Sequence, residues 1–205
     1  MRERVFLHGL GQGPESWEAT VRAMGAEGSV LCPGLSDWME EGADYPHLYQ
    51  GFAHWCDELD GPIHLCGLSL GGILALQYAA QYPERMASLA LIGTQYRMPK
   101  GLLRFQNALF SLMPEWLFQG AGIGKRNMMV LTRSMLELDL EEALNGLRCP
   151  VLILCGERDR ANRAAAEEMK ERLPHGELVF LPGAGHEVNV DAPEALGAEL
   201  KEFMG

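Results

Sequence analysis

The segment best suited to covalent chemistry is a serine between glycines, Gly67-Leu68-Ser69-Leu70-Gly71. An apolar run, 63–66, precedes it and a stretch with helical spacing follows, so the serine lies where a strand turns into a helix. Such a sharp turn exposes the hydroxyl and leaves no room for side chains at the two flanking glycines. The pattern predicts Ser69 as a nucleophile. The backbone N–H of Leu70, at the positive end of the helix, is then a donor to a developing oxyanion.

A serine hydroxyl is a weak nucleophile until a base removes its proton, so this motif needs partners elsewhere in the chain. His186, in the glycine-rich loop after the last apolar run, is the candidate general base. Asp159 lies just beyond the apolar run 151–154, at the edge where catalytic groups gather in open α/β sheets. We therefore predict a triad of Ser69, His186 and Asp159. Two alternatives remain open: Glu157 could be the acid instead, and Asp159 could merely cap the next helix.

Six short apolar runs, too short for helices, predict buried strands of a parallel sheet at 5–7, 29–31, 63–66, 88–92, 151–154 and 178–181. Stretches with helical spacing lie between most of them, at 45–59, 70–82 and 162–173. Asp191, with Glu194 three residues on, predicts the cap of a last helix that runs to Met204. The alternation predicts a doubly wound α/β fold with a mostly parallel sheet of about six strands and helices on both faces.

Residues 96–148 interrupt this alternation, because they contain no strand candidate and have helical patterns at 101–113 and 127–147. We interpret them as a helical insertion in a single domain of residues 1–205. Their apolar side chains either pack the insertion onto the domain or form a short lid over an apolar substrate pocket. Its basic side chains, most simply solvated, are also candidates to receive a carboxylate or phosphate of the substrate: Arg97, Lys100, Arg104, Lys125, Arg126 and Arg133.

Composition and spacing exclude several classes of function. The net charge is −11 and no basic stretch is present, which argues against nucleic acid as a partner. No run approaches the ~20 apolar residues of a membrane span, and no signal peptide is recognisable. The five cysteines form no Cys-x-x-Cys pair and predict reduced thiols in a cytoplasmic protein. Neither the histidines nor the glycines have metal-ligand, dinucleotide or phosphate-loop spacing, so we expect no metal or cofactor.

The order Ser, Asp, His and the motifs around these residues resemble the α/β-hydrolase superfamily, in particular its compact esterases and enol-lactone hydrolases. His8-Gly9 is similar to the family's oxyanion loop, and the resemblance implies the backbone N–H of Leu10 as the second oxyanion donor. Segments 82–85, 183–186 and 191–194 also resemble family motifs. The family usually opens with a hairpin before the His-Gly strand, whereas this chain starts at that strand. The resemblance therefore implies an α/β-hydrolase fold without the N-terminal hairpin.

The expected function is that of a serine hydrolase that cleaves a small carboxylic ester, lactone or thioester through an acyl-enzyme. Two alternatives remain. One is a lyase that uses the same triad to remove a proton, as in the menaquinone-pathway synthase of this fold. The other is a non-catalytic binder of a small ligand. The expected partner is a small-molecule substrate, and the sequence leaves both a monomer and a homodimer open.

Overall fold

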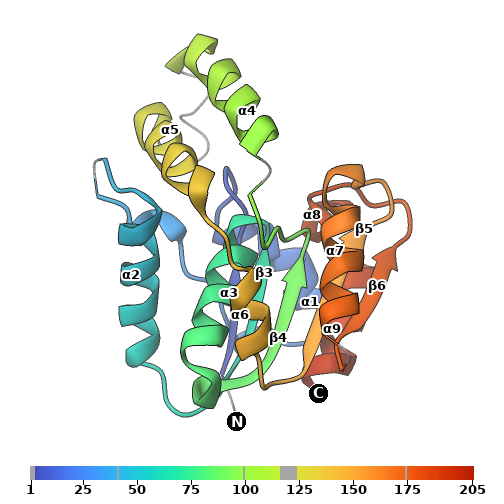
Figure 1. The fold of residues 1–205 in the computed structure, drawn as a ribbon. Helices are drawn as coiled ribbons and strands as arrows, with labels where there is room; N and C mark the ends of the chain where they lie inside the picture. The colour runs from blue at the N-terminus through green and yellow to red at the C-terminus, as the bar shows by residue number, and fades with distance from the viewer. Residues whose placement is uncertain (1–2, 41, 99, 116–123, 174) are drawn as a thin grey trace.

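The computed structural model describes residues 3–40, 42–98, 100–115, 124–173 and 175–205. Six strands of these segments form one sheet in the order β2-β1-β3-β4-β5-β6, and each neighbouring pair runs parallel (Figure 1). The strands are β1 (Arg4–Leu7), β2 (Val30–Leu31), β3 (Ile63–Leu68), β4 (Met86–Ile92), β5 (Val151–Gly156) and β6 (Glu177–Leu181). The six predicted strands and the α/β fold class are confirmed.

Both faces of the sheet are buried, which explains why its strands are apolar at successive positions. Side chains alternate between the faces along a strand. Val5 and Leu7 belong to the core that packs against α2, α3 and α7, whereas Phe6 belongs to a second core beneath α1 and α9. The helices on the first face are α2 (Tyr45–Asp57), α3 (Leu70–Gln81) and α7 (Arg160–Arg172), and those on the second are α1 (Glu18–Met24) and α9 (Pro193–Met204).

Two details of the helices differ from the sequence-based predictions. Helix α1 has only seven residues, and its pattern is too short to predict a helix. The prediction of Asp191 as the cap of the last helix was wrong, because Asp191 ends an additional short helix, α8 (Val188–Asp191), and Ala192 precedes α9. Its carboxylate instead accepts the backbone N–H of Gly185 at 2.6 Å. Asp191 therefore stabilises the loop that carries His186 through a hydrogen bond.

The described residues between β4 and β5 are mostly helical, and the stretch 127–147 is not one helix. Its described helices are α4 (Lys100–Leu112), α5 (Lys125–Ser134) and α6 (Glu141–Gly146). Figure 1 shows α4 and α5 beyond the carboxyl ends of the strands, whereas α6 lies beside α3. An isolated antiparallel bridge between Arg97 and Asp139 joins the segment before α4 to the segment before α6. The insertion is thus anchored at its base and extends from the edge where the candidate catalytic residues were predicted.

Candidate active site at the carboxyl edge of the sheet

Ser69 occupies the turn between β3 and α3. Its φ of 52° makes it the one non-glycine residue with positive φ in the described part of the chain. Such a conformation costs on the order of 1–3 kcal/mol and persists only where the surroundings impose it. A Cβ at Gly67 would lie 2.3 Å from the carbonyl of Gly71, and a Cβ at Gly71 would lie 2.3 Å from the carbonyl oxygen of Leu7. The glycines of the motif therefore allow the tight turn that presents the serine.

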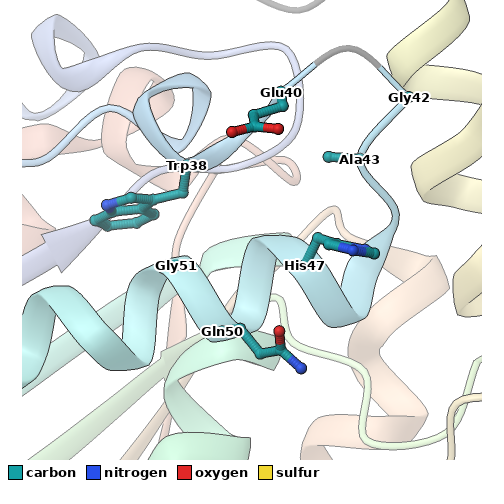
Figure 2. A pocket seen from close by; sticks show the side chains of 7 residues that line it. All are labelled: Trp38, Glu40, Gly42, Ala43, His47, Gln50 and Gly51. Atoms are coloured by element: carbon teal, nitrogen blue, oxygen red, sulfur yellow. The ribbon is translucent and has the colours of Figure 1, made fainter.

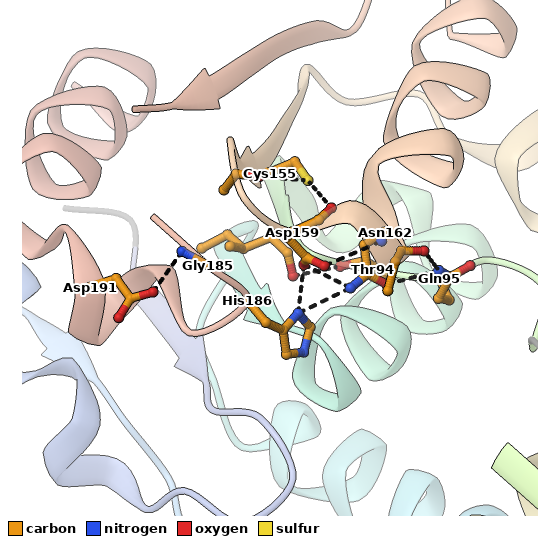
Figure 3. Close-up of polar contacts among 11 residues, drawn as sticks. Thr94, Gln95, Cys155, Asp159, Asn162, Gly185, His186 and Asp191 are labelled. Carbon is orange, nitrogen blue, oxygen red and sulfur yellow. Dashed lines mark hydrogen bonds and ion pairs between the residues drawn. The ribbon is translucent and has the colours of Figure 1, made fainter. Parts of the chain in front are cut away.

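Asp159 and His186 are in direct contact although they come from different loops (Figure 3). His186 Nδ1 lies 2.7 Å from Asp159 Oδ2, and the carboxylate side chain is 4% exposed. Burial raises the pKa of Asp159, but hydrogen bonds from His186 and Asn162 outweigh burial, so this pKa lies below its ordinary value of 3.8. Asp159 is thus held as a carboxylate, and with Nδ1–H donated to it the imidazole keeps Nε2 free as a proton acceptor.

Ser69 and the Asp159–His186 pair meet at the end of β4. The backbone N–H of Ser69 donates to the carbonyl oxygen of Ile92 at 2.8 Å. The next residue, Gly93, has a φ of 52°, and a Cβ there would lie 3.0 Å from His186 Nδ1 and 3.3 Å from Asp159 Oδ2. The three predicted residues therefore gather around one strand end. Within the described chain no hydrogen bond connects the Ser69 hydroxyl to His186, and such bonds often form only when substrate is bound.

Glu157, the alternative acid, has a different partner. Its Oε2 accepts the backbone N–H of Gly183 at 2.9 Å, and its side chain is exposed. The helix-cap interpretation of Asp159, in contrast, holds together with its contact to His186. Asp159 is the N-cap of α7, and its Oδ1 accepts the backbone N–H of Asn162 at 3.3 Å.

The loop after β1, the predicted oxyanion loop, is fixed by a buried histidine. The backbone N–H of Leu35 donates to His8 Nε2 at 3.1 Å, so Nδ1 carries the proton and donates to the carbonyl of Gly9 at 2.9 Å. The N–H of Gly9 donates to Gln12 Oε1 at 3.2 Å. Leu10, the predicted donor, lies between these anchored residues. Leu70 is the first residue of α3, so its N–H has no partner within the helix.

The insertion contacts this predicted oxyanion loop through apolar side chains. Met128 of α5 is 5% exposed and packs with Leu10, Met39, Phe110 and Met113. This cluster, the Met128 cluster, lies next to a predicted oxyanion donor. Both interpretations of the insertion, packing and lid, are compatible with it.

Several basic side chains of the insertion already have partners. Arg97 pairs with Glu141 at 2.7 Å, Lys100 pairs with Glu137, and Lys125 Nζ donates to the carbonyls of Ser111 and Met113. The side chain of Arg104 lies outside the described residues. At three of the six basic positions the charge is therefore already engaged within the insertion.

A hollow of about 440 Å³ lies apart from these residues, between the loop after β2 and α2 (Figure 2). Its lining includes none of the predicted catalytic residues and consists of Trp38, Glu40, Gly42, Ala43, His47, Gln50 and Gly51. Among the described residues, no cluster of three or more His, Cys, Asp or Glu side chains could hold a metal ion. None of the described helices combines the length and apolar character that crossing a membrane requires.

Sequence reasoning missed two polar residues beside the Asp159–His186 pair. Asn162 Nδ2 donates to Asp159 Oδ2 at 2.7 Å and lies 3.1 Å from His186 Nδ1, and Gln95 Nε2 donates to Asn162 Oδ1 at 2.8 Å. The one available signal was the position of Asn162, third in the helix that Asp159 caps. Gln95 gave no signal, because only the fold brings the end of β4 next to α7.

Comparison with known proteins identifies the family. The sequence model of the "Alpha/beta hydrolase family" matches residues 5–199, nearly the whole chain. The chain belongs to the alpha/beta hydrolase family. The resemblance inferred from the motifs is confirmed.

Three known proteins illustrate the relationship. The chain is 38% identical to a pimeloyl-[acyl-carrier protein] methyl ester esterase of Aromatoleum aromaticum, over 98% of this chain and 97% of that protein. It is 26% identical to a Bacillus subtilis protein provisionally named 2-succinyl-6-hydroxy-2,4-cyclohexadiene-1-carboxylate synthase, over 98% and 89%. Its fold is similar to that of a thermophilic esterase from Thermogutta terrifontis, with a TM-score of 0.81, 23% identity, and coverage of 100% of this chain and 89% of that one.

Proposed function

We propose that this hydrolase cleaves a small carboxylic ester, with Ser69 as nucleophile, His186 as general base and Asp159 as the acid that orients it. The observation that carries the proposal is the 2.7 Å contact between His186 Nδ1 and the buried carboxylate of Asp159, at the strand end beside the strained turn of Ser69. A buried carboxylate fixes the tautomer of the imidazole and stabilises its protonated form.

In the first half of the reaction, Ser69 Oγ attacks the ester carbonyl carbon while His186 Nε2 takes the hydroxyl proton. The carbonyl oxygen becomes an oxyanion, and the backbone N–H groups of Leu10 and Leu70 donate to it. Each such donor contributes about 3–4 kcal/mol of transition-state stabilisation in comparable sites. When the tetrahedral intermediate collapses, the C–O bond to the alcohol breaks, and the proton on Nε2 passes to the departing alkoxide. An acyl-enzyme on Ser69 remains.

In the second half, His186 takes a proton from a water molecule as its oxygen attacks the acyl carbon. Collapse of the second tetrahedral intermediate returns the proton to Ser69 Oγ and releases the carboxylic acid. The neutral imidazole is required in both halves, so activity falls as pH is lowered and the imidazole is protonated. No step needs a metal ion or an organic cofactor.

The relatives and the insertion support a proposal for the substrate class. The Aromatoleum relative is named for a methyl ester carried by an acyl carrier protein, which favours an ester with a small alcohol group. The Met128 cluster beside Leu10 favours an apolar acyl chain. We therefore propose alkyl esters of medium-chain acids as the class, ahead of lactones and thioesters. We also propose a cytoplasmic location, because all five cysteines are free thiols.

The test is hydrolysis of p-nitrophenyl acetate, butyrate and octanoate and of monomethyl pimelate by the purified protein and by Ser69→Ala. We expect turnover by the wild type and a loss of at least about 10³-fold in kcat for the variant. Ser134→Ala, a change at the last residue of α5, is the matched control and is expected to retain turnover. Wild-type-like turnover by Ser69→Ala would exclude Ser69 as the nucleophile.

The second candidate function is the lyase, favoured by the similarity to the Bacillus subtilis protein named as a synthase. There the same triad would remove a proton from carbon instead of forming an acyl-enzyme on Ser69. Absence of ester turnover, together with no acyl-enzyme mass shift after incubation with p-nitrophenyl butyrate, would favour the lyase or a non-catalytic binder.

A further inference from the structure

Asn162 occupies an unusual place, because it contacts both members of the Asp159–His186 pair (Figure 3). Its Nδ2 lies 2.7 Å from Asp159 Oδ2, the same oxygen that His186 Nδ1 contacts at 2.7 Å. The Asn162 side chain is buried, with 8% of the residue exposed. The carboxylate oxygen that orients the imidazole is thus shared between two donors.

The orientation of the Asn162 amide follows from its other neighbour. Gln95 Nε2 donates to the carbonyl oxygen of Ala161 at 3.1 Å, which identifies that end of the Gln95 amide as the nitrogen. The same nitrogen lies 2.8 Å from Asn162, so the Asn162 atom that faces it is the oxygen. The Asn162 nitrogen therefore faces Asp159 and His186. If the Asn162 amide were reversed, its oxygen would face the Asp159 carboxylate and its nitrogen would face Gln95 Nε2.

We propose that Asn162, held by Gln95, is a positioning residue that weakens the hold of Asp159 on the protonated imidazole of His186. This inference rests on the proposed function. An oxygen that accepts two hydrogen bonds offers each donor less negative charge than an oxygen that accepts one. The imidazolium is then less stabilised than it would be beside an unshared carboxylate.

Several other charged groups near this pair have hydrogen-bond or ion-pair partners of their own. Asp191 and Glu157 accept backbone N–H groups of the histidine loop, from Gly185 and Gly183. Glu187 follows His186 and is exposed to solvent. Cys155 Sγ lies 3.8 Å from the Asp159 carbonyl oxygen, and burial raises the pKa of this thiol to about 11, so it is neutral. On α7, Arg163 and Glu167 pair with each other at 3.2 Å.

The test compares pH profiles of kcat/KM for the wild type, Asn162→Val and Gln95→Met. Valine has a similar shape to asparagine and keeps the backbone N–H that Asp159 caps. We expect the acidic limb of the Asn162→Val profile to move to higher pH by about half a unit. At pH values well below the midpoint of the limb, kcat/KM of the variant is then about threefold lower than that of the wild type. Gln95→Met, which removes the partner that holds the Asn162 amide, should move the acidic limb in the same direction by a smaller amount. Asn145→Val, on the exposed side of α6, should superimpose on the wild type.

Two outcomes would overturn the inference: an Asn162→Val limb at the wild-type pH, or a loss of activity that is uniform at all pH values. The second would assign Asn162 a structural role only. A second measurement does not depend on turnover. The NMR titration midpoint of His186, assigned with His186→Gln, should shift upward in Asn162→Val in the same way. If ester turnover is absent but this midpoint shifts, the proposed function fails and the effect of Asn162 on the imidazole stands.

Discussion

At the scale of single residues, Asp159 serves two structural purposes with its two oxygens. Oδ1 caps α7 through the N–H of Asn162, and Oδ2 contacts His186. The cap fixes the carboxylate on the first turn of a helix, so the imidazole is oriented by a rigid element. The two interpretations of Asp159 that the sequence left open are therefore both compatible with the structure.

A second single residue, His8, makes the free energy of unfolding depend on pH. Burial lowers the pKa of His8 below its ordinary value of 6.5, since the charged imidazolium is poorly solvated there. Protonation of Nε2 would also break the hydrogen bond that it accepts from the N–H of Leu35. The unfolded chain takes up this proton near 6.5, whereas the folded protein does so only at lower pH. The free energy of unfolding should thus be greatest above this pH and fall below it. Urea unfolding between about pH 7.5 and 5.5 measures this slope.

The variant His8→Gln is expected to unfold more easily, but its stability should depend less on pH over the same range. His54→Gln is the matched control, since the His54 side chain is 84% exposed, and its curve should run parallel to that of the wild type. A His8→Gln curve parallel to the wild type would assign the slope to other groups.

At the scale of elements, an amide pair joins the predicted oxyanion loop to α8. Gln12 and Asn189 donate to each other's side-chain oxygens at 3.2 Å, and Asn189 also donates to the carbonyl of Ser16. Asn189 is fully buried, so no water replaces a lost partner at its surface. The loop that holds Leu10 is therefore fixed to the segment that follows His186.

We predict that Asn189→Ala lowers the free energy of unfolding by about 1–3 kcal/mol, because buried polar groups lose their partners. With the oxyanion loop released, kcat should fall roughly tenfold or more while KM changes little. Asn145→Ala, at an exposed helix position, is the control for both measurements. A loss of stability with unchanged kcat would show that the amide pair supports the fold and not Leu10.

At the scale of the whole molecule, the sheet provides the predicted catalytic residues and the insertion extends beyond the same edge (Figure 1). The Met128 cluster is the contact between the two parts beside Leu10. If the insertion limits the length of the acyl chain, Met128→Ala should raise the ratio of kcat/KM for p-nitrophenyl octanoate to that for the acetate by about threefold or more.

Met135→Ala is the matched control, since Met135 is equally buried, at 5% exposed, but belongs to the main core. Both variants should lose stability, by about 2–5 kcal/mol for a fully packed methionine. Only Met128→Ala should change the ratio. An equal ratio in both variants would assign the Met128 cluster to packing alone.

The sequence by itself determined the six strands of the sheet, because buried parallel strands leave continuous apolar runs that can be read locally. The turn at Ser69 was equally local, since its glycines are adjacent in the chain. Helix α1 and the division of the stretch 127–147 were not predicted, because short helices depend on tertiary packing more than on their own pattern. The cap assigned to Asp191 failed for a related reason: an extra turn of helix intervenes.

Only the tertiary structure decided which polar side chains surround Asp159 and His186. Gln95, Asn162 and His186 come from three separate segments, the loop after β4, the first turn of α7 and the loop after β6, and their contacts depend on how β4, β5 and β6 place these segments at one edge. Motifs can predict the three candidate catalytic residues, whose roles remain predictions. The hydrogen bonds that adjust the strength of a base depend on distances of a few ångströms across the fold, and no spacing along the chain encodes them.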